Sequence, residues 1–456
     1  MSPPESLTSV LACPRSDAPL EIRDDVLYCR ASDVRYPLLG GIPWLFAEPD
    51  VARGEWRQRY QHANTRLDEH LAGVEAALVQ PDLSAATRAR LDCLQTGFRT
   101  QRAALSSLLK PLLEGSSSVP RATYLALRTR LPADQGLNTY LPNVHRDWGW
   151  GDAENAGSLE MLSEVLGTAN PQRVLVLGAG AGRLAHDLNV ALAPELCVGL
   201  DFNPLLMLLA ARLDRGEDVQ LVEFPMAPRT NLDHAVVRTL RAATKPATPT
   251  QWVLGDALRA PFQAGAFDLV VTPWLVDIIS ESPAAFAPRV NRLLAADGVW
   301  LNFGSVAFRE PDIAACIGIE ELTEQCVSGG FAHRQTLERE LPYLDSPASR
   351  HGRVETVAAM RFDKTSDAAV VPRWRALPDW IVIGKTPVPA SDAFLSQAAA
   401  TRIHAFIMAL IDGRRSLQDM ASIMQQRGLM PAADAEEAIR GFLIKMHDDA
   451  RRYSGF

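Results

Sequence analysis

The residues best suited to chemistry are three glycines at alternate positions and the aspartate that closes the next apolar run. Gly178, Gly180 and Gly182 follow the short apolar run 174–177, which is typical of a buried parallel strand. Glycine at these places permits a tight turn and lets a ligand lie against bare backbone. Asp201 ends the apolar run 196–200, and an acid there can accept both hydroxyls of a ribose. The segment therefore predicts a site for a ligand that contains ribose.

The spacing of the glycines separates two classes of ligand. The turn has the pattern G-x-G-x-G, whereas the dinucleotide fingerprint is G-x-G-x-x-G. S-adenosylmethionine has no diphosphate to cradle, so a shorter turn suffices for it. The pattern favours this methyl donor over a dinucleotide. A glycine turn that binds no ligand is the third interpretation, because a fold alone does not imply a function.

Two further acids and one arginine flank predicted strands in the same region. Asp256 ends the apolar run 252–255, where an acid commonly meets the exocyclic amine of adenine. Asp277 follows the run 267–276, and the carboxyl ends of parallel strands face the crevice in which open sheets bind ligands. Arg146 lies in residues 138–152, which are either an ordinary buried loop or a lid that places the guanidinium on a carboxylate.

Composition and charge exclude several classes of function. The chain has 456 residues, too many for one ordinary domain, and a formal net charge of −8. This charge argues against nonspecific nucleic-acid binding, and no apolar run is long enough to span a membrane. The N-terminus lacks the basic start and apolar core of a signal peptide, and the six cysteines are scattered. We therefore expect a cytoplasmic protein with reduced thiols and neither a nucleic-acid nor a membrane partner.

The order of the patterns predicts an α/β fold, a Rossmann-like sheet with a helical N-terminal layer and small flanking domains. Within the sheet domain we expect a polar insertion at 214–250, a helix at 288–294 and a final antiparallel pair of strands. The chain divides into a small hairpin unit, a helical region, the sheet domain, a proline-containing linker and a helical domain, at residues 1–50, 51–137, 138–364, 365–389 and 390–456.

The first part of the chain resembles the zinc-ribbon family of methyltransferase activators, which carries two cysteine pairs and a Y-P-I-x-x-G-I-P motif. Residues 36–43 are YPLLGGIP, but Ser16 stands at the place of one cysteine and Cys29 has no close cysteine partner. Two thiolates are too few for a closed structural zinc site. We therefore expect the ribbon fold without a metal, packed against or covering the sheet domain.

Near the other end, residues 410–421 resemble the small winged-helix domains related to the pyrroloquinoline-quinone peptide chaperone. Such domains bind leader peptides in some pathways. A structural cap or a homodimer contact is the other interpretation of this helical domain.

Residues 138–364 resemble the carnosine N-methyltransferase family. The resemblance rests on VHRDWG at 144–149, RVLVLGAGAGRL at 173–184, GD at 255–256, FDLVVT at 267–272 with Asp277 after it, and WLNFG at 300–304. It implies a Rossmann-like class I methyltransferase sheet, S-adenosylmethionine as cofactor and no metal. It also implies methylation of an imidazole ring nitrogen in a histidine-containing dipeptide.

On the donor side, the resemblance implies a role for each matching residue. Arg146 would bind the methionine carboxylate, and the turn of Gly178, Gly180 and Gly182 would lie beneath the donor. Asp201 would accept hydrogen bonds from the ribose hydroxyls, and Asp256 would accept one from the exocyclic amine of adenine.

On the acceptor side, Asp277 would face the substrate and hold or deprotonate the accepting nitrogen, and Tyr343 would line the substrate site. This chain departs from the family where Phe308 and Arg309 replace a Tyr-His pair, and where Asn143 replaces a glutamine beside the donor. Arg309 would suit a substrate carboxylate. The substrate is then a small histidine-containing or amino-acid-derived molecule, or a peptide that docks on residues 390–453.

Two other classes of function stay open. A scaffold or regulatory protein could keep the fold and the donor, although the intact glycine turn, Asp201 and Asp256 argue against it. An NAD-dependent dehydrogenase is the weakest alternative, because the chain lacks the longer glycine fingerprint and a clear histidine for hydride transfer.

Overall fold

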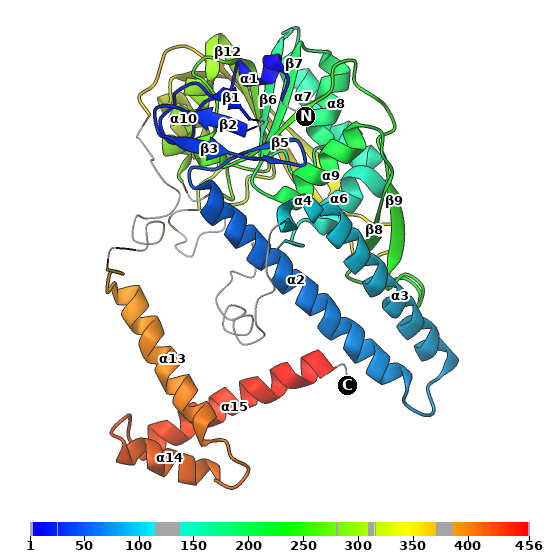
Figure 1. Ribbon diagram of the computed structural model, residues 1–456, viewed down its shortest axis with the longest axis vertical. Coiled ribbons are helices and arrows are strands. Elements are labelled where there is room, and N and C mark those ends of the chain that lie inside the picture. The colour runs from blue at the N-terminus through cyan, green and yellow to red at the C-terminus, as the bar shows by residue number, and fades with distance from the viewer. Residues whose placement is uncertain are drawn as a thin grey trace. The chain divides into compact units, whose positions relative to one another are not determined.

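The structure is a computed structural model that describes residues 3–24, 26–114, 137–279, 281–308, 314, 316–370, 385 and 387–454. The chain forms two compact units, Met1–Ala376 and Leu377–Phe456. The first contains the sheet and most of the helices, and the second contains the last three helices (Figure 1). Within the described residues, no helix is long and apolar enough to cross a membrane.

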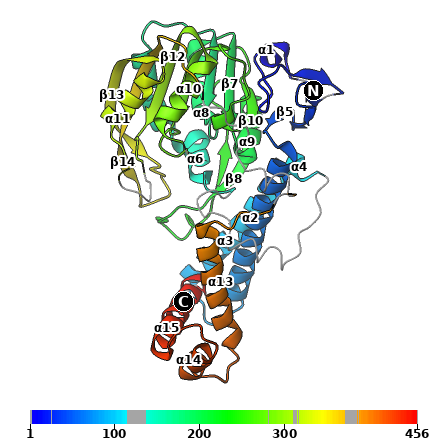
Figure 2. The ribbon, with the colours of Figure 1, turned by 90° about the vertical axis from the view of Figure 1, so that its left-hand side faces the viewer.

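A nine-stranded sheet organises the first unit, in the order β13-β14-β12-β11-β6-β7-β10-β5-β4 (Figure 2). β6, β7, β10, β11 and β12 run parallel, and β14 is antiparallel to both β12 and β13. This confirms the predicted Rossmann-like α/β class and the final antiparallel pair. The strands are β6 (Arg173–Leu177), β7 (Leu196–Asp201), β10 (Gln251–Gly255), β11 (Phe267–Pro273), β12 (Leu294–Gly304), β13 (Phe331–Tyr343) and β14 (Arg353–Lys364).

Side chains alternate along the central strands and so build one core on each face of the sheet. Val174 and Val176 join the cluster that includes α7, α8 and α9, whereas Leu175 and Leu177 join the cluster that includes α10 and α11. Both faces are apolar because helices cover both of them. These helices are α7 (Asp152–Leu166), α8 (Arg183–Leu192), α9 (Pro204–Asp214), α10 (Pro283–Leu293) and α11 (Ile319–Ser328).

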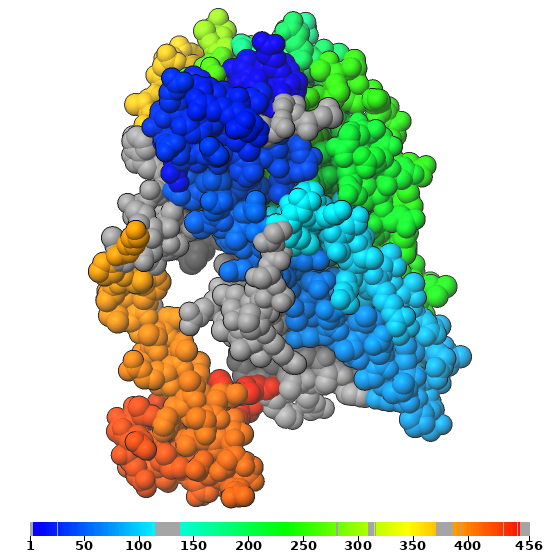
Figure 3. Space-filling model, in the orientation of Figure 1, coloured from blue at the N-terminus to red at the C-terminus, as the bar shows by residue number. Residues whose placement is uncertain are grey.

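The N-terminal segment, predicted as a small hairpin unit at residues 1–50, contributes two strands to the main sheet. β5 (Ile42–Leu45) pairs in parallel with β10, and β4 (Leu38–Leu39) pairs with β5. All four residues of β5 are buried, and pairing satisfies the edge of β10. The rest lies over the sheet domain (Figure 3) as α1 (Glu5–Thr8), β1 (Glu21–Arg23), β2 (Val26–Cys29) and β3 (Val34–Tyr36).

The predicted helical layer is present as two long helices that pack against each other (Figure 1). They are α2 (Pro49–Leu78) and α3 (Ala85–Leu108), followed by the short α4 (Lys110–Leu113). The predicted N-cap is confirmed, because the Ser84 hydroxyl accepts a hydrogen bond from the Thr87 backbone N–H. Residues 115–136 of the predicted layer lie outside the described residues.

Three local predictions need correction. Residues 138–152 are not a loop, because α6 (Leu141–His145) continues into a π-helical turn, η2 (Arg146–Trp150). The polar insertion contains an antiparallel pair, β8 (Val219–Glu223) and β9 (Val236–Leu240). The helix predicted at 288–294 begins earlier, since Pro283 opens α10 and Pro288 lies inside it.

The described residues 387–454 of the second unit form three helices: α13 (Asp392–Leu410), α14 (Leu417–Gln426) and α15 (Ala432–Ser454). A small core joins them, with Met424, Ala435 and Ile439 fully buried. A capping box formed by Ser416 and Asp419 begins α14. Residues 387–454 contain no strand, so the wing of the predicted winged-helix-like domain is not seen in this part of the chain.

Candidate active site

A cavity of about 260 Å³ opens at the carboxyl ends of the parallel strands. Its lining comes from α6, η2, α7, α8 and α9, and from the ends of β6, β7, β10, β11, β12 and β13 or the turns that follow them. This is where open α/β sheets bind ligands, because the loops at the strand ends diverge there. The polar or glycine lining residues include Tyr140, Asn143, Arg146, Asp147, Gly178, Gly180, Asp187, Asp201, Asp277 and Tyr343.

The glycine turn after β6 forms one wall of the cavity. Gly178 and Gly180 line it with positive φ angles of 71° and 58°, and a Cβ on Gly180 would meet open space. Gly182 does not line it. A Cβ on Gly182 would lie 2.7 Å from Ala210 Cβ and 2.7 Å from the Trp252 ring. Two of the three predicted glycines therefore border the cavity, and the third permits close packing of α8.

Asp201 lies at the end of β7 and is 6% exposed. Its Oδ2 accepts a hydrogen bond from the Gly180 N–H and its Oδ1 accepts one from the Asn203 N–H, both at 2.9 Å. Burial raises the pKa of Asp201 to about 6, although these backbone N–H groups oppose the shift. Each carboxylate oxygen keeps a further lone pair, so Asp201 can still accept hydroxyls from a ligand.

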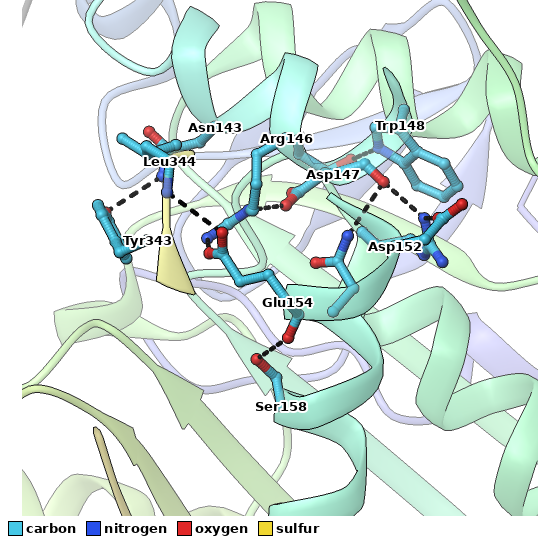
Figure 4. Close-up of polar contacts among 12 residues, drawn as sticks. Asn143, Arg146, Asp147, Trp148, Asp152, Glu154, Ser158, Tyr343 and Leu344 are labelled. Carbon is cyan, nitrogen blue, oxygen red and sulfur yellow. Dashed lines mark hydrogen bonds and ion pairs between the residues drawn. The ribbon is translucent and has the colours of Figure 1, made fainter. Parts of the chain in front are cut away.

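Arg146 lies at the start of η2, where two carboxylates hold its guanidinium (Figure 4). Nε donates to Asp147 Oδ1 and Nη1 donates to Glu154 Oε1, each at 2.6 Å. Burial raises the pKa of both carboxyls, and one shared guanidinium offsets this only in part. Among the described residues, Nη2 has no hydrogen-bond partner. In this structure Arg146 contacts carboxylates of the chain itself, and its predicted contact with the donor carboxylate stays a prediction.

The two remaining predicted aspartates differ in position. The Asp256 carboxylate accepts a hydrogen bond from the Leu258 N–H at 2.9 Å and so begins the 3-10 turn η3 (Ala257–Arg259). Its neighbours Gly255 and Ala257 line the cavity, whereas Asp256 does not. Asp277 does line the cavity, and its Oδ2 accepts a hydrogen bond from the Ala307 N–H at 2.9 Å.

Aromatic side chains form the wall near Asp277. The rings of Tyr343 and Trp274 lie 4.9 Å apart between centroids, and the Asn143 amide donates to the Tyr343 hydroxyl at 3.4 Å. Arg309, the other predicted substrate residue, lies outside the described residues. Trp274 and Tyr140 are lining residues that the sequence reasoning missed.

Trp274 has a strained backbone. Its φ angle is +51°, in the left-handed region that bulky residues rarely adopt, and its N–H donates to the Phe303 carbonyl at 2.6 Å. Strain of this kind persists only where the surroundings hold it, and it concentrates at functional sites. A tryptophan directly after Pro273 at a strand end was the signal available in the sequence.

The charge of the cavity is unbalanced. Among the described residues that line it, four carry carboxylates and one, Arg146, carries a guanidinium. Arg183, which does not line the cavity, pairs with Asp187 at 2.8 Å. A site of this kind favours a positively charged ligand and disfavours a diphosphate.

In the N-terminal segment, Cys13 and Cys29 lie beside Ser32 and Ser16, but these side chains do not fit a zinc ion. Cys13 Sγ lies 3.3 Å from Ser32 Oγ, and Ser16 Oγ lies 3.3 Å from Cys29 Sγ. The two hydroxyls are hydrogen-bonded to the two thiols, whereas a closed zinc site needs thiolates or imidazoles. Within the described chain, no cluster of three or more His, Cys, Asp or Glu residues could hold a metal.

Together, the sheet order, the glycine turn and the acid at the end of β7 define the fold of a class I methyltransferase. Residues 175–301, from β6 to β12, match the family model of a methyltransferase domain. S-adenosylmethionine is the cofactor of this domain. No curated protein matches the sequence.

Several solved structures are similar to part of this chain at low identity. The YcgJ protein of Bacillus subtilis is 14% identical, with 46% of this chain and 99% of that chain covered and a TM-score of 0.32. A TehB-like S-adenosylmethionine-dependent methyltransferase of Corynebacterium glutamicum is 16% identical, with 47% and 94% covered and a TM-score of 0.29. A Haemonchus contortus phosphoethanolamine N-methyltransferase is 12% identical, with 51% and 58% covered and a TM-score of 0.34. Similarities this low say nothing about the substrate of this chain.

Proposed function

We propose that this chain is an N-methyltransferase that acts on a small histidine-containing or other amino-acid-derived molecule, a peptide included. One observation carries the proposal. Gly178, Gly180 and Asp201 line the same cavity as Asp277 and the aromatic pair Trp274 and Tyr343. The glycines and Asp201 suit a methyl donor that contains ribose, and Asp277 with the two rings suits a flat, proton-bearing acceptor.

The residues on the donor side fit S-adenosylmethionine. The open space at Gly180 leaves room against the backbone, Asp201 offers acceptors to ribose hydroxyls, and Nη2 of Arg146 can donate to a carboxylate. When bound, the donor supplies a methyl group made electrophilic by a sulfonium. The excess of carboxylates in the lining suits this cation better than the diphosphate of NAD.

On the acceptor side, we propose that Asp277 holds the proton of the substrate. An imidazole has one nitrogen with a free lone pair and one N–H, and a carboxylate that accepts from the N–H keeps the other nitrogen available. Tyr343 and Trp274 offer ring faces against which a flat ring can pack. Aligning the acceptor nitrogen in this way is the principal contribution a protein makes to a direct displacement.

The peptide variant of the proposal uses the second unit. The second unit exposes apolar side chains, including Phe394, Leu395 and Ile444, that could receive part of a longer substrate. Arg309 would then bind a carboxylate of the substrate.

The test begins with calorimetric titration of the purified protein with S-adenosylhomocysteine and, separately, with NAD. We expect micromolar binding of the first and none of the second. Incubation with S-adenosylmethionine and a panel of histidine, histidine dipeptides and histidine-containing peptides should then give a methylated product by mass spectrometry. Binding of the donor without methylation of any panel member would favour a scaffold, and binding of NAD alone would overturn the proposal.

A further inference from the structure

Glu154 is buried in the first turn of α7, where its carboxylate joins two segments that are distant in sequence. Its Oε1 accepts a hydrogen bond from Arg146 Nη1 at 2.6 Å, and its Oε2 accepts one from the Leu344 backbone N–H at 3.2 Å. The residue is 6% exposed, and Figure 4 shows the side chain between the two partners. Arg146 lies on the donor side of the cavity, and Leu344 directly follows Tyr343.

The contact with Arg146 fixes the direction of the guanidinium. Asp147 holds Nε and Glu154 holds Nη1, so that rotation about the end of the side chain would break one charge-assisted hydrogen bond or the other. Nη2 is the group that remains for a ligand. Without Glu154, the guanidinium would keep a single anchor.

The contact with Leu344 holds a strained turn. Leu344 has a φ angle of +54°, a left-handed conformation that costs a bulky residue free energy. It ends β13 immediately after Tyr343, whose ring lies 4.9 Å from that of Trp274. The hydrogen bond to Glu154 thus stabilises the backbone that directs Tyr343 to the cavity.

We propose that Glu154 is a positioning residue that couples the donor half of the cavity to the acceptor half. It touches neither ligand but acts through Arg146 and through the Tyr343–Leu344 turn. The inference rests on the proposed function for the identity of the two halves. A carboxylate is required because both of its oxygens accept, whereas an amide has one acceptor and one donor and must break one of the two contacts.

The test compares Glu154→Gln with Glu164→Gln as a matched control. Glu164 lies on the same helix and also contacts β13, through Arg339 at 2.5 Å, but its side chain is 46% exposed and remote from the cavity lining. S-adenosylhomocysteine is the probe, its affinity is measured by calorimetry, and hydrogen–deuterium exchange is followed in peptides that cover residues 341–352.

In the native protein, the probe should slow exchange across residues 341–352. In Glu154→Gln the probe should bind about tenfold more weakly, as expected for loss of one buried charge-assisted hydrogen bond, and should no longer slow this exchange. The control should behave like the native protein in both respects. A purely structural role would change the unfolding temperature but leave the protection by the probe intact.

Native affinity and native protection in Glu154→Gln would overturn the inference. If that variant does not fold, Glu154→Asp takes its place, because the shorter carboxylate keeps its charge but cannot reach both partners. A native protein that binds no S-adenosylhomocysteine would instead defeat the proposed function. The contact itself would then still be tested without the probe, by whether Glu154→Gln speeds exchange at Leu344.

Discussion

The backbone N–H of Gly180 donates a hydrogen bond of 2.9 Å to the carboxylate of Asp201 and so joins the turn after β6 to the end of β7. The glycine turn and the Asp201 carboxylate, which we propose to bind the donor and its ribose, are therefore held in one arrangement without a ligand. Burial raises the pKa of this carboxyl to about 6, although the hydrogen bond from Gly180 opposes the shift.

Donor binding should depend on pH through Asp201. Burial raises the pKa of this carboxyl to about 6, and only the ionised form accepts two ribose hydroxyls without a competing proton. We expect the affinity for S-adenosylhomocysteine to rise about tenfold between about pH 5 and about pH 7. In Asp201→Asn the affinity should be lower and nearly independent of pH in that range. Parallel pH profiles of native and variant protein would contradict the assignment.

The raised pKa of Asp201 should also make the ligand-free protein less stable as the pH rises. The folded state keeps the proton up to a pKa of about 6, whereas the unfolded chain releases it near the ordinary value for aspartate. Between these values the folded state binds more protons, so the free energy of unfolding falls with pH, by up to about 3 kcal/mol. Denaturant titrations of native protein and Asp201→Asn at several pH values would measure the difference.

Two glycines of one turn should respond differently to alanine. In Gly182→Ala the Cβ would lie 2.7 Å from Ala210 Cβ, and we expect a loss of about 3 kcal/mol of stability. In Gly180→Ala the Cβ meets open space, and the cost is the left-handed backbone alone, about 1–2 kcal/mol. Gly180→Ala should nevertheless bind S-adenosylhomocysteine several-fold more weakly. Thermal unfolding of both variants measures the loss of stability, and calorimetric titration with S-adenosylhomocysteine measures the loss of affinity.

Asp277 should affect turnover rather than donor binding. Its Oδ2 accepts the Ala307 N–H, and an asparagine oxygen can keep that hydrogen bond while the charge is lost. Asp277→Asn should therefore bind S-adenosylhomocysteine normally and lose most of its turnover, by a factor of about 10² or more. The assay uses any acceptor found in the panel of histidine compounds. Normal turnover in this variant would remove Asp277 from the mechanism.

The sheet and the glycine turn could be predicted because both rest on local sequence. A short apolar strand, glycines with positive φ and a periodic helix determine their own conformations, and so 173–201 folds as expected. The pairing of β5 with β10 could not be predicted, because a buried apolar run of four residues does not specify which strand it joins.

The site was harder to predict where it depends on partners distant in the chain. The predicted contact of Arg146 with the carboxylate of the donor stays a prediction. Its contacts with Asp147 and Glu154 were not predicted, because no spacing rule identifies a π-helical turn that brings them together. Glu154 meets Leu344 only because α7 packs beside β13. The left-handed backbone of Leu344 likewise leaves no local pattern in the sequence.

The N-terminal segment should gain a metal when Ser16 and Ser32 are replaced by cysteine. Cys13, Ser16, Cys29 and Ser32 lie together, with each hydroxyl 3.3 Å from a thiol. Ser16→Cys with Ser32→Cys would supply four thiolates, and we expect one tightly bound zinc ion per chain together with a higher unfolding temperature that a chelator reverses. Elemental analysis after exhaustive dialysis measures the zinc, with the two single variants and the native protein as controls. We expect the native protein to hold no zinc, because its two hydroxyls are hydrogen-bonded to its two thiols. One zinc ion per chain in the native protein would contradict this expectation. A folded double variant without zinc would show that the four positions do not form a tetrahedral site.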